Sequence, residues 1–190
     1  MKRRRKTDFS KIMRDTNLLG SGRVGVIPTD TIYGIVGSAL DKKVVERIYR
    51  LRKRDPKKPM IILIGDICAL RLFGIKIDHK MEDALNNVWP GKVSVILPCQ
   101  SKSFYYLHRG TKTLAFRLPK PLLLRRFLWK TGPLVAPSAN INGMPPSKTI
   151  AEAKRYFTDG VDFYVNVGSI HSKPSKIIKI EHGKINVVRV

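Results

Sequence analysis

Residues Val24 to Ala39 read V-G-V-I-P-T-D-T-I-Y-G-I-V-G-S-A, and the stretch is apolar at both ends and polar in the middle. The apolar ends predict two strands, the first over Arg23–Ile27, because valine and isoleucine pack well on a sheet. Pro28 has no N–H for a strand ladder, so we expect the first strand to end there. The two threonines and the aspartate that follow predict either a hydrogen-bonded turn or one wall of a binding cleft.

The rest of the chain alternates irregularly between helical and strand-like patterns. The expected helices are Asp8–Leu19, Asp41–Lys53, Asp66–Phe73, Met81–Val88, Leu122–Trp129 and Lys148–Phe157. The further expected strands are Met60–Ile64, Val93–Leu97, Thr113–Leu118, Leu134–Pro137, Phe163–Val167, Ser175–Ile180 and Lys184–Val190. Strands that follow one another directly favour an α/β fold with a twisted mixed sheet over a doubly wound parallel one. There is neither an internal repeat nor a low-complexity linker, so we expect a single domain over residues 1–190.

Helix ends are indicated by residues that can cap them. Asp41 is the expected N-cap of the helix that follows it, and Thr149 or Ser147 is the expected N-cap of the last helix. On the Asp41 helix, Val44 and Ile48 begin an apolar stripe, and a basic stripe runs beside it.

Positive charge is the strongest feature of the composition. Lysine and arginine number 37 against 14 acidic residues, for a formal net charge of +23. Nine basic and two acidic residues lie between Lys42 and Lys58. A field of this size attracts polyanions such as nucleotides, tRNA or other RNA, although a solvated surface gives the same totals.

Several classes of protein are disfavoured. No apolar run approaches the ~20 residues that a membrane span needs. The basic N-terminus, M-K-R-R-R-K-T-D-F, lacks the apolar stretch of a signal peptide, so we expect a cytoplasmic protein without a membrane partner. Cys68 and Cys99 lack C-x-x-C spacing, and the four histidines lack zinc-ligand spacing, so we expect no metal site.

Four segments place polar side chains where predicted strands begin or end. They are Pro28–Gly34, Arg52–Pro59, Thr113–Pro119 and Ala136–Gly143. Ligands of open α/β sheets bind at such ends, and arginine is a forked, permanently charged partner for carboxylate or phosphate. The chain has no G-x-x-x-x-G-K-[ST] loop, no G-x-G-x-x-G fingerprint and no G-x-S-x-G elbow, so an enzyme here would work by positioning and electrostatics.

Each segment also has a purely structural interpretation. The threonines and Asp30 could satisfy a turn, Arg117 could be half of a buried ion pair, and Ser138 with Asn140 could be an ordinary cap and turn. The basic run could be a solvated helix face. Local pattern alone leaves both interpretations open.

Taken in order, the segments resemble the YrdC-like family of L-threonylcarbamoyladenylate synthases. P-T-D-T-I-Y-G resembles the family's P-T-D-T-x-Y-G, and T-L-A-F-R-L-P resembles its T-V-A-V-R-x-P. P-L-V-A-P-S-A-N-I-N-G resembles P-L-A-A-P-S-A-N-x-S-G, and R-K-R-D-P-K-K-P-M-I resembles K-x-R-x-x-x-K-P-L-I. W-P-G, K-P-S-K-I-I and a near-terminal arginine complete the series. The resemblance covers about Gly25 to Arg189 and implies a fold with a basic concave cleft.

The resemblance also implies a reaction. Such enzymes use L-threonine, bicarbonate or CO2, and ATP, and they make threonylcarbamoyl-AMP and pyrophosphate. A downstream threonylcarbamoyl-transfer complex then modifies an adenosine of tRNA. The nucleophile is the carbamate of threonine, so no nucleophilic side chain is needed. Mg²⁺ would arrive with ATP, and no tightly bound cofactor is implied.

Roles carry over by position. Catalytic roles fall on Arg52, Arg54 and Lys58. Threonine contacts fall on Thr31, Arg117, Ser138 and Ser175, and nucleotide contacts on Arg54, Lys58, Thr113, Asn140 and Arg189. Asp30 would hold the loop or touch ligand.

This chain departs from the family pattern at four positions: Arg52 replaces lysine, Asn142 serine, Lys176 threonine, and Leu63 a histidine found in some relatives. The first change keeps the charge but turns a compact ammonium into a wide fork. Two other functions stay open. One is a related domain of larger carbamoyltransferases, and the other is a YciO-like module that binds double-stranded RNA or tRNA without synthase activity.

Overall fold

A computed structural model describes residues 16–20, 22–181 and 184–189 of the 190-residue chain. Most of the helix expected over Asp8–Leu19 lies outside these residues. Its last four residues form a short 3-10 helix, η1 (Thr16–Leu19).

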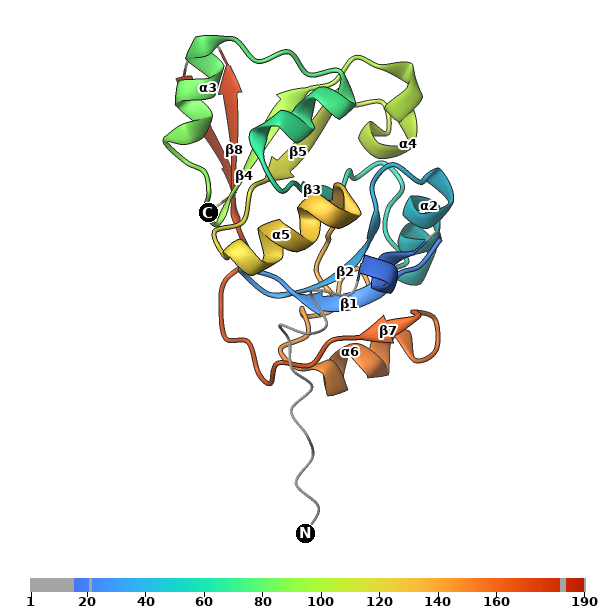
Figure 1. The fold of residues 1–190 in the computed structure, drawn as a ribbon. Helices are drawn as coiled ribbons and strands as arrows, with labels where there is room; N and C mark the ends of the chain where they lie inside the picture. Colours follow the sequence, from blue (N-terminus) through green and yellow to red (C-terminus); the bar gives the residue numbers. More distant parts are fainter. Residues whose placement is uncertain (1–15, 21, 182–183, 190) are drawn as a thin grey trace.

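The described residues form one nine-stranded sheet, whose strands lie in the order β7-β1-β2-β6-β3-β5-β4-β8-β9. The strands are β1 (Gly25–Pro28), β2 (Tyr33–Ser38), β3 (Ile61–Leu63), β4 (Val93–Pro98), β5 (Thr113–Arg117), β6 (Leu134–Val135), β7 (Phe163–Tyr164), β8 (Lys176–Glu181) and β9 (Lys184–Arg189). Three neighbouring pairs, β1 with β7, β3 with β5 and β4 with β8, are parallel, and the other five are antiparallel. The predicted mixed α/β sheet is therefore confirmed (Figure 1).

Helices flank this sheet on both faces (Figure 1). They are α2 (Lys42–Leu51), η2 (Ile67–Phe73), α3 (His79–Asn86), η3 (Lys102–Phe104), α4 (Tyr105–His108), α5 (Leu122–Thr131) and α6 (Ile150–Phe157). Asp41 is the N-cap of α2, since its carboxylate accepts hydrogen bonds from the N–H groups of Lys43 and Val44. Thr149, and not Ser147, caps α6 through the N–H of Glu152.

The two faces of the sheet have different coverings, because successive side chains on a strand point to opposite sides. On one face, residues such as Ile35, Ile62 and Phe116 join the main core, together with Val44 and Ile48 of α2. On the other face, Val36 and Leu63 pack beneath α5 in a smaller core. In the part of the chain that the structure describes, this core covers only part of that face. Small side chains beside it leave room for a cavity.

The elements differ from the sequence predictions mainly at their ends. The strand expected over Leu134–Pro137 is regular only through Val135, and the strand expected over Phe163–Val167 only through Tyr164. The next N–H groups, of Ala136 and Val165, still donate to the carbonyls of Ile61 and Val26. Pro137 has no N–H for a ladder, which ends regular pairing there, although its carbonyl still accepts from the N–H of Ile35 at 3.0 Å. The helix expected over Asp66–Phe73 is a 3-10 helix, η2.

The short helices η3 and α4 were not predicted from sequence. Across the described residues, none of the helices combines the length and the apolar character needed to cross a bilayer.

Candidate active site

A cavity of about 460 Å³ lies beside α5, on the face of the sheet that this helix covers only in part. Ala115 and Ala136 form part of its wall, and Ile61 shares their side of the sheet. Eight of the ten predicted site residues line it: Thr31, Arg52, Arg54, Thr113, Arg117, Ser138, Ser175 and Arg189. Segments far apart in sequence therefore meet here, as the four polar segments predicted.

The P-T-D-T segment is a hydrogen-bonded turn that also forms a wall of the cavity. The hydroxyl of Thr29 accepts from the N–H groups of Thr31 and Ile32 and donates to the Ile32 carbonyl at 2.7 Å. Thr31 lines the cavity, and its hydroxyl lies 3.1 Å from that of Thr29. The segment is therefore a turn, as one interpretation predicted, and this turn also places Thr31 in the cavity wall.

Arg117 is half of a buried ion pair and also lines the cavity. Its Nη2 lies 3.1 Å from Oδ1 of Asp30, and the two side chains are 4% and 2% exposed. Burial lowers the pKa of Arg117 and raises that of Asp30, in each case against the attraction of the partner. Nε of Arg117 has no hydrogen-bond partner among the described residues. The pair thus presents a desolvated cation to the cavity.

Arg52 is buried at the end of α2 and is bound by the S-A-N segment. Its Nε donates to the Asn140 carbonyl at 3.0 Å, and its Nη2 donates to Oδ1 of Asn140 at 3.1 Å and to the Ser138 hydroxyl at 3.2 Å. Burial lowers the pKa of Arg52 to about 10, and the nearby charge of Arg54 contributes a smaller part of this shift. The guanidinium of Arg52 therefore stays protonated at neutral pH. Its Nη1 has no hydrogen-bond partner among the described residues.

Asn140 does not line the cavity, although the resemblance implies a nucleotide contact for it. Its side-chain oxygen accepts from Arg52, and its amide nitrogen donates to the carbonyls of Ile141 and Met144 at 2.9 and 2.6 Å. Its hydrogen-bonding groups are thus used in holding Arg52 and the loop.

Arg54 points from the segment after α2 to the cavity. Its Nε donates to the Lys58 carbonyl at 2.9 Å, and its Nη2 donates to the Pro59 carbonyl at 2.8 Å. The side chain of Lys58 is exposed and is not part of the cavity wall. In this structure Lys58 contributes its backbone, which orients Arg54.

Ser175 and Arg189 form another part of the wall. The Ser175 hydroxyl lies 2.9 Å from that of Ser94, and the Ser175 carbonyl accepts from Nη2 of Arg189 at 2.8 Å. Partial burial lowers the pKa of Arg189. Ser94 was missed by the sequence analysis, although it is the one polar residue within the apolar run Val93–Leu97.

The cavity wall is cationic. Four arginines line it, and no aspartate or glutamate is among the described residues that form the wall. The wall also contains Thr111, Pro146, Pro174 and Val188, which were not predicted. Thr111, Pro146 and Pro174 lie in loops, and Val188 lies in the edge strand β9. Only the tertiary fold brings these segments to the cavity.

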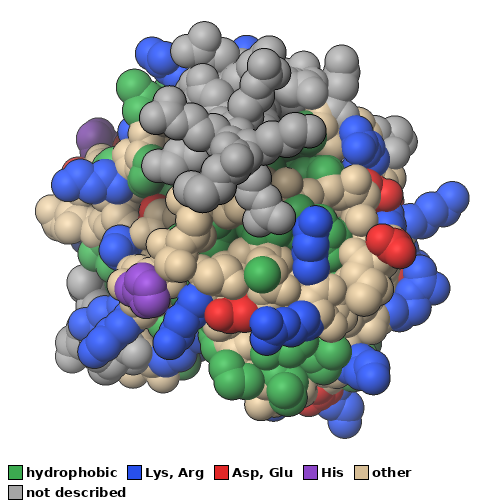
Figure 2. Space-filling model, turned by 90° about the horizontal axis from the view of Figure 1, so that it is seen from below, with side chains coloured by type: hydrophobic (Ala, Val, Ile, Leu, Met, Phe, Trp, Pro, Cys, Tyr) green, Lys and Arg blue, Asp and Glu red, His purple; other side chains and the backbone are tan. Residues whose placement is uncertain are grey.

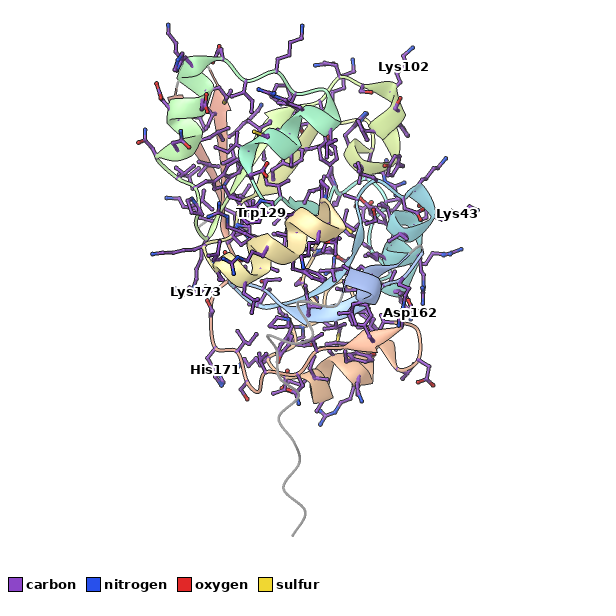
Figure 3. All side chains as sticks on the ribbon, viewed as in Figure 1. Lys43, Lys102, Trp129, Asp162, His171 and Lys173 are labelled. Carbon is purple, nitrogen blue, oxygen red and sulfur yellow. The ribbon has the colours of Figure 1, made fainter. Side chains whose placement is uncertain are left out.

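The basic run Lys42–Lys58 is divided among different environments. Lys43 points outward from α2 (Figure 3). Arg47, in contrast, pairs with Asp162 at 2.8 Å. Arg52 and Arg54 face the cavity. On the face shown in Figure 2, lysines and arginines lie in several separate places, and a few carboxylates lie near some of them. This run therefore does not form one continuous basic surface.

Comparisons with known proteins find a family that matches nearly the whole chain. A family model named Sua5_yciO_yrdC, with the description "Telomere recombination", matches residues 17–190. A threonylcarbamoyl-AMP synthase of Bacillus subtilis is 32% identical over 156 residues, which are 81% of this chain and 45% of that protein. The chain thus spans about half the length of this relative.

Two solved structures have the same fold. Sua5 of Pyrococcus abyssi, in complex with L-threonine, matches with a TM-score of 0.83 and 26% identity over 94% of this chain and 53% of its own. Escherichia coli YciO matches with a TM-score of 0.80 and 24% identity over 95% of this chain and 89% of its own, a likeness of fold alone. With a family model that matches from residue 17 to residue 190 and a sheet that superposes on these structures, the chain belongs to the Sua5/YciO/YrdC family.

Proposed function

We propose that the chain is an L-threonylcarbamoyladenylate synthase, which makes threonylcarbamoyl-AMP and pyrophosphate from L-threonine, bicarbonate or CO2, and ATP. A relative that is 32% identical has the name of this activity, and the related P. abyssi protein has been solved with L-threonine.

The observation that carries the proposal is a pair of incompletely bonded arginines in the cavity wall. Nη1 of Arg52 and Nε of Arg117 are buried donors without a hydrogen-bond partner among the described residues. Buried polar groups are normally satisfied, and a guanidinium is best satisfied by carboxylate, carbamate or phosphate oxygens. The wall therefore suits a ligand with several anionic oxygens, as threonine and ATP have.

The arrangement fits the chemistry of the proposed reaction. The neutral amine of threonine attacks CO2, and loss of one amine proton gives a carbamate. A carbamate oxygen then attacks the α-phosphorus of ATP, the bond from that phosphorus to the bridging oxygen breaks, and pyrophosphate leaves. Both reactants are anions, so their approach is opposed by repulsion that fixed arginine charges would offset. No side-chain nucleophile is required.

We assign different residues of the cavity wall to the two substrates, with Ser175 and Arg189 in contact where the two assignments meet. Thr31, Arg117, Ser138 and Ser175 would contact threonine. Arg54, Thr113 and Arg189 would contact the nucleotide, and Arg52 would stabilise charge between the two. Asn140 and Lys58 would act through Arg52 and Arg54, which they hold by hydrogen bonds.

Mg²⁺ would come with the nucleotide. Magnesium prefers carboxylate and water oxygens, and the described wall of the cavity contributes no carboxylate that could hold the ion independently. When bound to ATP, the ion would neutralise part of the phosphate charge.

The product would pass to a threonylcarbamoyl-transfer complex that modifies tRNA, and an enzyme that uses ATP for this purpose would work in the cytoplasm. Direct contact with tRNA or other RNA, as in the YciO-like alternative, would depend on exposed lysines and arginines outside the cavity.

Pyrophosphate release tests the proposal. The purified chain is incubated with Mg-ATP, L-threonine and bicarbonate, and each component is omitted in turn. We expect pyrophosphate only when all are present. Pyrophosphate that does not depend on threonine, or none at all, would overturn the proposal, and an electrophoretic shift of duplex RNA by the inactive protein would favour the YciO-like function.

A further inference from the structure

The side of the cavity that we assign to the nucleotide is built from Arg189 of β9 and from two further segments. Arg54–Pro59 follows α2, and Thr111–Thr113 leads into β5. Residues 54–59 and 111–112 lie outside the helices and strands. Something must hold them at a fixed separation if Arg54 and Thr113 are to bind one nucleotide together.

Arg109 lies just before the second segment and is directed toward α2. Its guanidinium carbon lies 4.0 Å from the centre of the Tyr49 ring, and its Nη2 lies 2.9 Å from Oε1 of Glu46. The side chain is only 13% exposed, whereas that of Glu46 is 39% exposed. A cation over an aromatic face and beside a carboxylate is attracted by both, and more strongly when water is excluded.

The backbone at Arg109 is also unusual. Its φ is 52°, in the left-handed region that residues other than glycine, asparagine and aspartate rarely adopt. Arg109 is the C-cap of α4, and its N–H donates to the Tyr105 carbonyl at 2.8 Å, so this φ belongs to the turn that ends the helix. Two residues later the chain reaches Thr111, in the cavity wall.

Tyr49 continues the connection to the first segment. Its ring is buried, and its hydroxyl donates to the Lys58 carbonyl at 3.0 Å. The same carbonyl accepts from Nε of Arg54 at 2.9 Å. The contacts therefore run from Arg109 through Tyr49 to the backbone that orients Arg54.

We propose that Glu46, Tyr49 and Arg109 form a clamp that sets the separation of the two walls at the nucleotide end of the cavity. These three are positioning residues, because none is part of the cavity wall among the described residues. The inference rests on the proposed function, since that function is what makes this end the nucleotide end. The clamp determines how tightly Mg-ATP binds and leaves threonine binding unaffected.

Calorimetric titration with Mg-ATP and, separately, with L-threonine tests the clamp. Tyr49→Phe keeps the ring and removes only the hydroxyl that reaches Lys58, and Arg109→Met removes the cation but keeps an apolar stem. We expect each to weaken Mg-ATP binding by about three- to tenfold, the size of one hydrogen bond or one buried cation–ring contact, and to change threonine binding by less than about twofold. Tyr49→Phe with Arg109→Met should weaken ATP binding by less than the product of the single effects, because the two act through one connection.

Tyr106→Phe is the matched control. Its hydroxyl also donates to a backbone carbonyl, that of Ala39 at 2.9 Å, and it is not part of the cavity wall. We expect this variant to bind both ligands like the wild type. Thermal unfolding of every variant separates a loss of ATP affinity from a loss of folded protein.

Three results would overturn the clamp: unchanged ATP affinity in Tyr49→Phe, equal weakening of ATP and threonine binding, or independent effects of the two substitutions. The clamp and the proposed function can fail separately. A wild type that binds both ligands but releases no pyrophosphate would refute the synthase reaction and would still allow the clamp to be judged by these titrations. A wild type that binds no Mg-ATP would refute both.

Discussion

Asp30 and Arg117 form a buried ion pair beside the cavity. Buried ion pairs commonly lose more by desolvation than they gain by attraction. Here burial raises the pKa of Asp30 and lowers that of Arg117, so each group is destabilised in its charged form. We therefore expect the pair to add nothing to the stability of the fold and to serve by holding a cation at the cavity.

Substitutions at this pair test that view. Asp30→Asn leaves the Arg117 cation buried without its counter-charge and should lower the free energy of unfolding by about 3 kcal/mol. Adding Arg117→Met removes the second charge and should restore stability to within about 1 kcal/mol of the wild type or above it, while pyrophosphate release is lost. Urea unfolding at neutral pH measures both. A double variant that stays more than about 1 kcal/mol less stable than the wild type would show that the pair stabilises the fold.

Arg54 is the residue on which we expect activity to depend most strongly. Arg54→Ala should reduce kcat/KM by at least about 100-fold, the usual effect of removing a group that stabilises transition-state charge. Its two hydrogen bonds reach only the neighbouring carbonyls of Lys58 and Pro59, so the fold should persist.

The neighbouring Lys57→Ala is the control for Arg54→Ala, because it removes one exposed cation from the same segment. Steady-state pyrophosphate release and circular dichroism would be compared. Turnover that survives in Arg54→Ala, or falls equally in Lys57→Ala, would contradict the assigned site.

Most of the residues that the motifs singled out line the cavity, but the motifs did not indicate their partners. Thr31, Arg117 and Ser138 line the cavity as expected. The pairing of Arg117 with Asp30, and the use of Asn140 to hold Arg52, depend on contacts between segments more than 80 positions apart. Local pattern contains no information on such contacts.

Among the elements, α2 is tied to the turn before β7 by one ion pair. Nη1 of Arg47 donates to Oδ2 of Asp162 at 2.8 Å, and the same oxygen accepts from the N–H of Val24 at 2.7 Å. Burial alone would raise the pKa of Asp162, but these partners and Arg23 outweigh it, and the net shift is downward. A lowered pKa means that the carboxylate stabilises the fold above its unfolded pKa of about 3.9 and that this contribution is lost as the pH falls through the folded value.

Asp162→Asn should therefore lower stability at neutral pH by about 0.5–1 kcal/mol, a value limited by the partial exposure of the pair. The difference from the wild type should shrink as the pH falls below about 4. Urea unfolding over pH 3–7 measures this, with Asp159→Asn as a control for the loss of one exposed acidic charge nearby. A difference that stays constant with pH would contradict the role of the charge.

Element types were more predictable than element ends. The apolar stripe of α2 and its Asp41 cap are local signals, and both are present in the structure. The short strands β6 and β7 end where neighbouring strands stop pairing, which their own sequence cannot show. The small helices η3 and α4 have no amphipathic pattern long enough to be recognised.

Across the molecule as a whole, the net charge of +23 predicted a polyanionic partner but did not indicate which part of the surface would bind it. The structure separates basic residues that line the cavity from those that face solvent or pair with carboxylates. The cavity itself arises where α5 covers only part of one sheet face, and that arrangement is a property of the tertiary fold.

As a synthase, the molecule would join threonine, a one-carbon unit and AMP in this single cavity. Mass spectrometry of the nucleotide products formed with ¹³C-bicarbonate is the sharpest test of that activity. We expect threonylcarbamoyl-AMP that is heavier by one label than the product made with ordinary bicarbonate, and no such species when threonine is omitted. An adenylate that contains no threonine, or no label, would show that the cavity does not carry out this reaction.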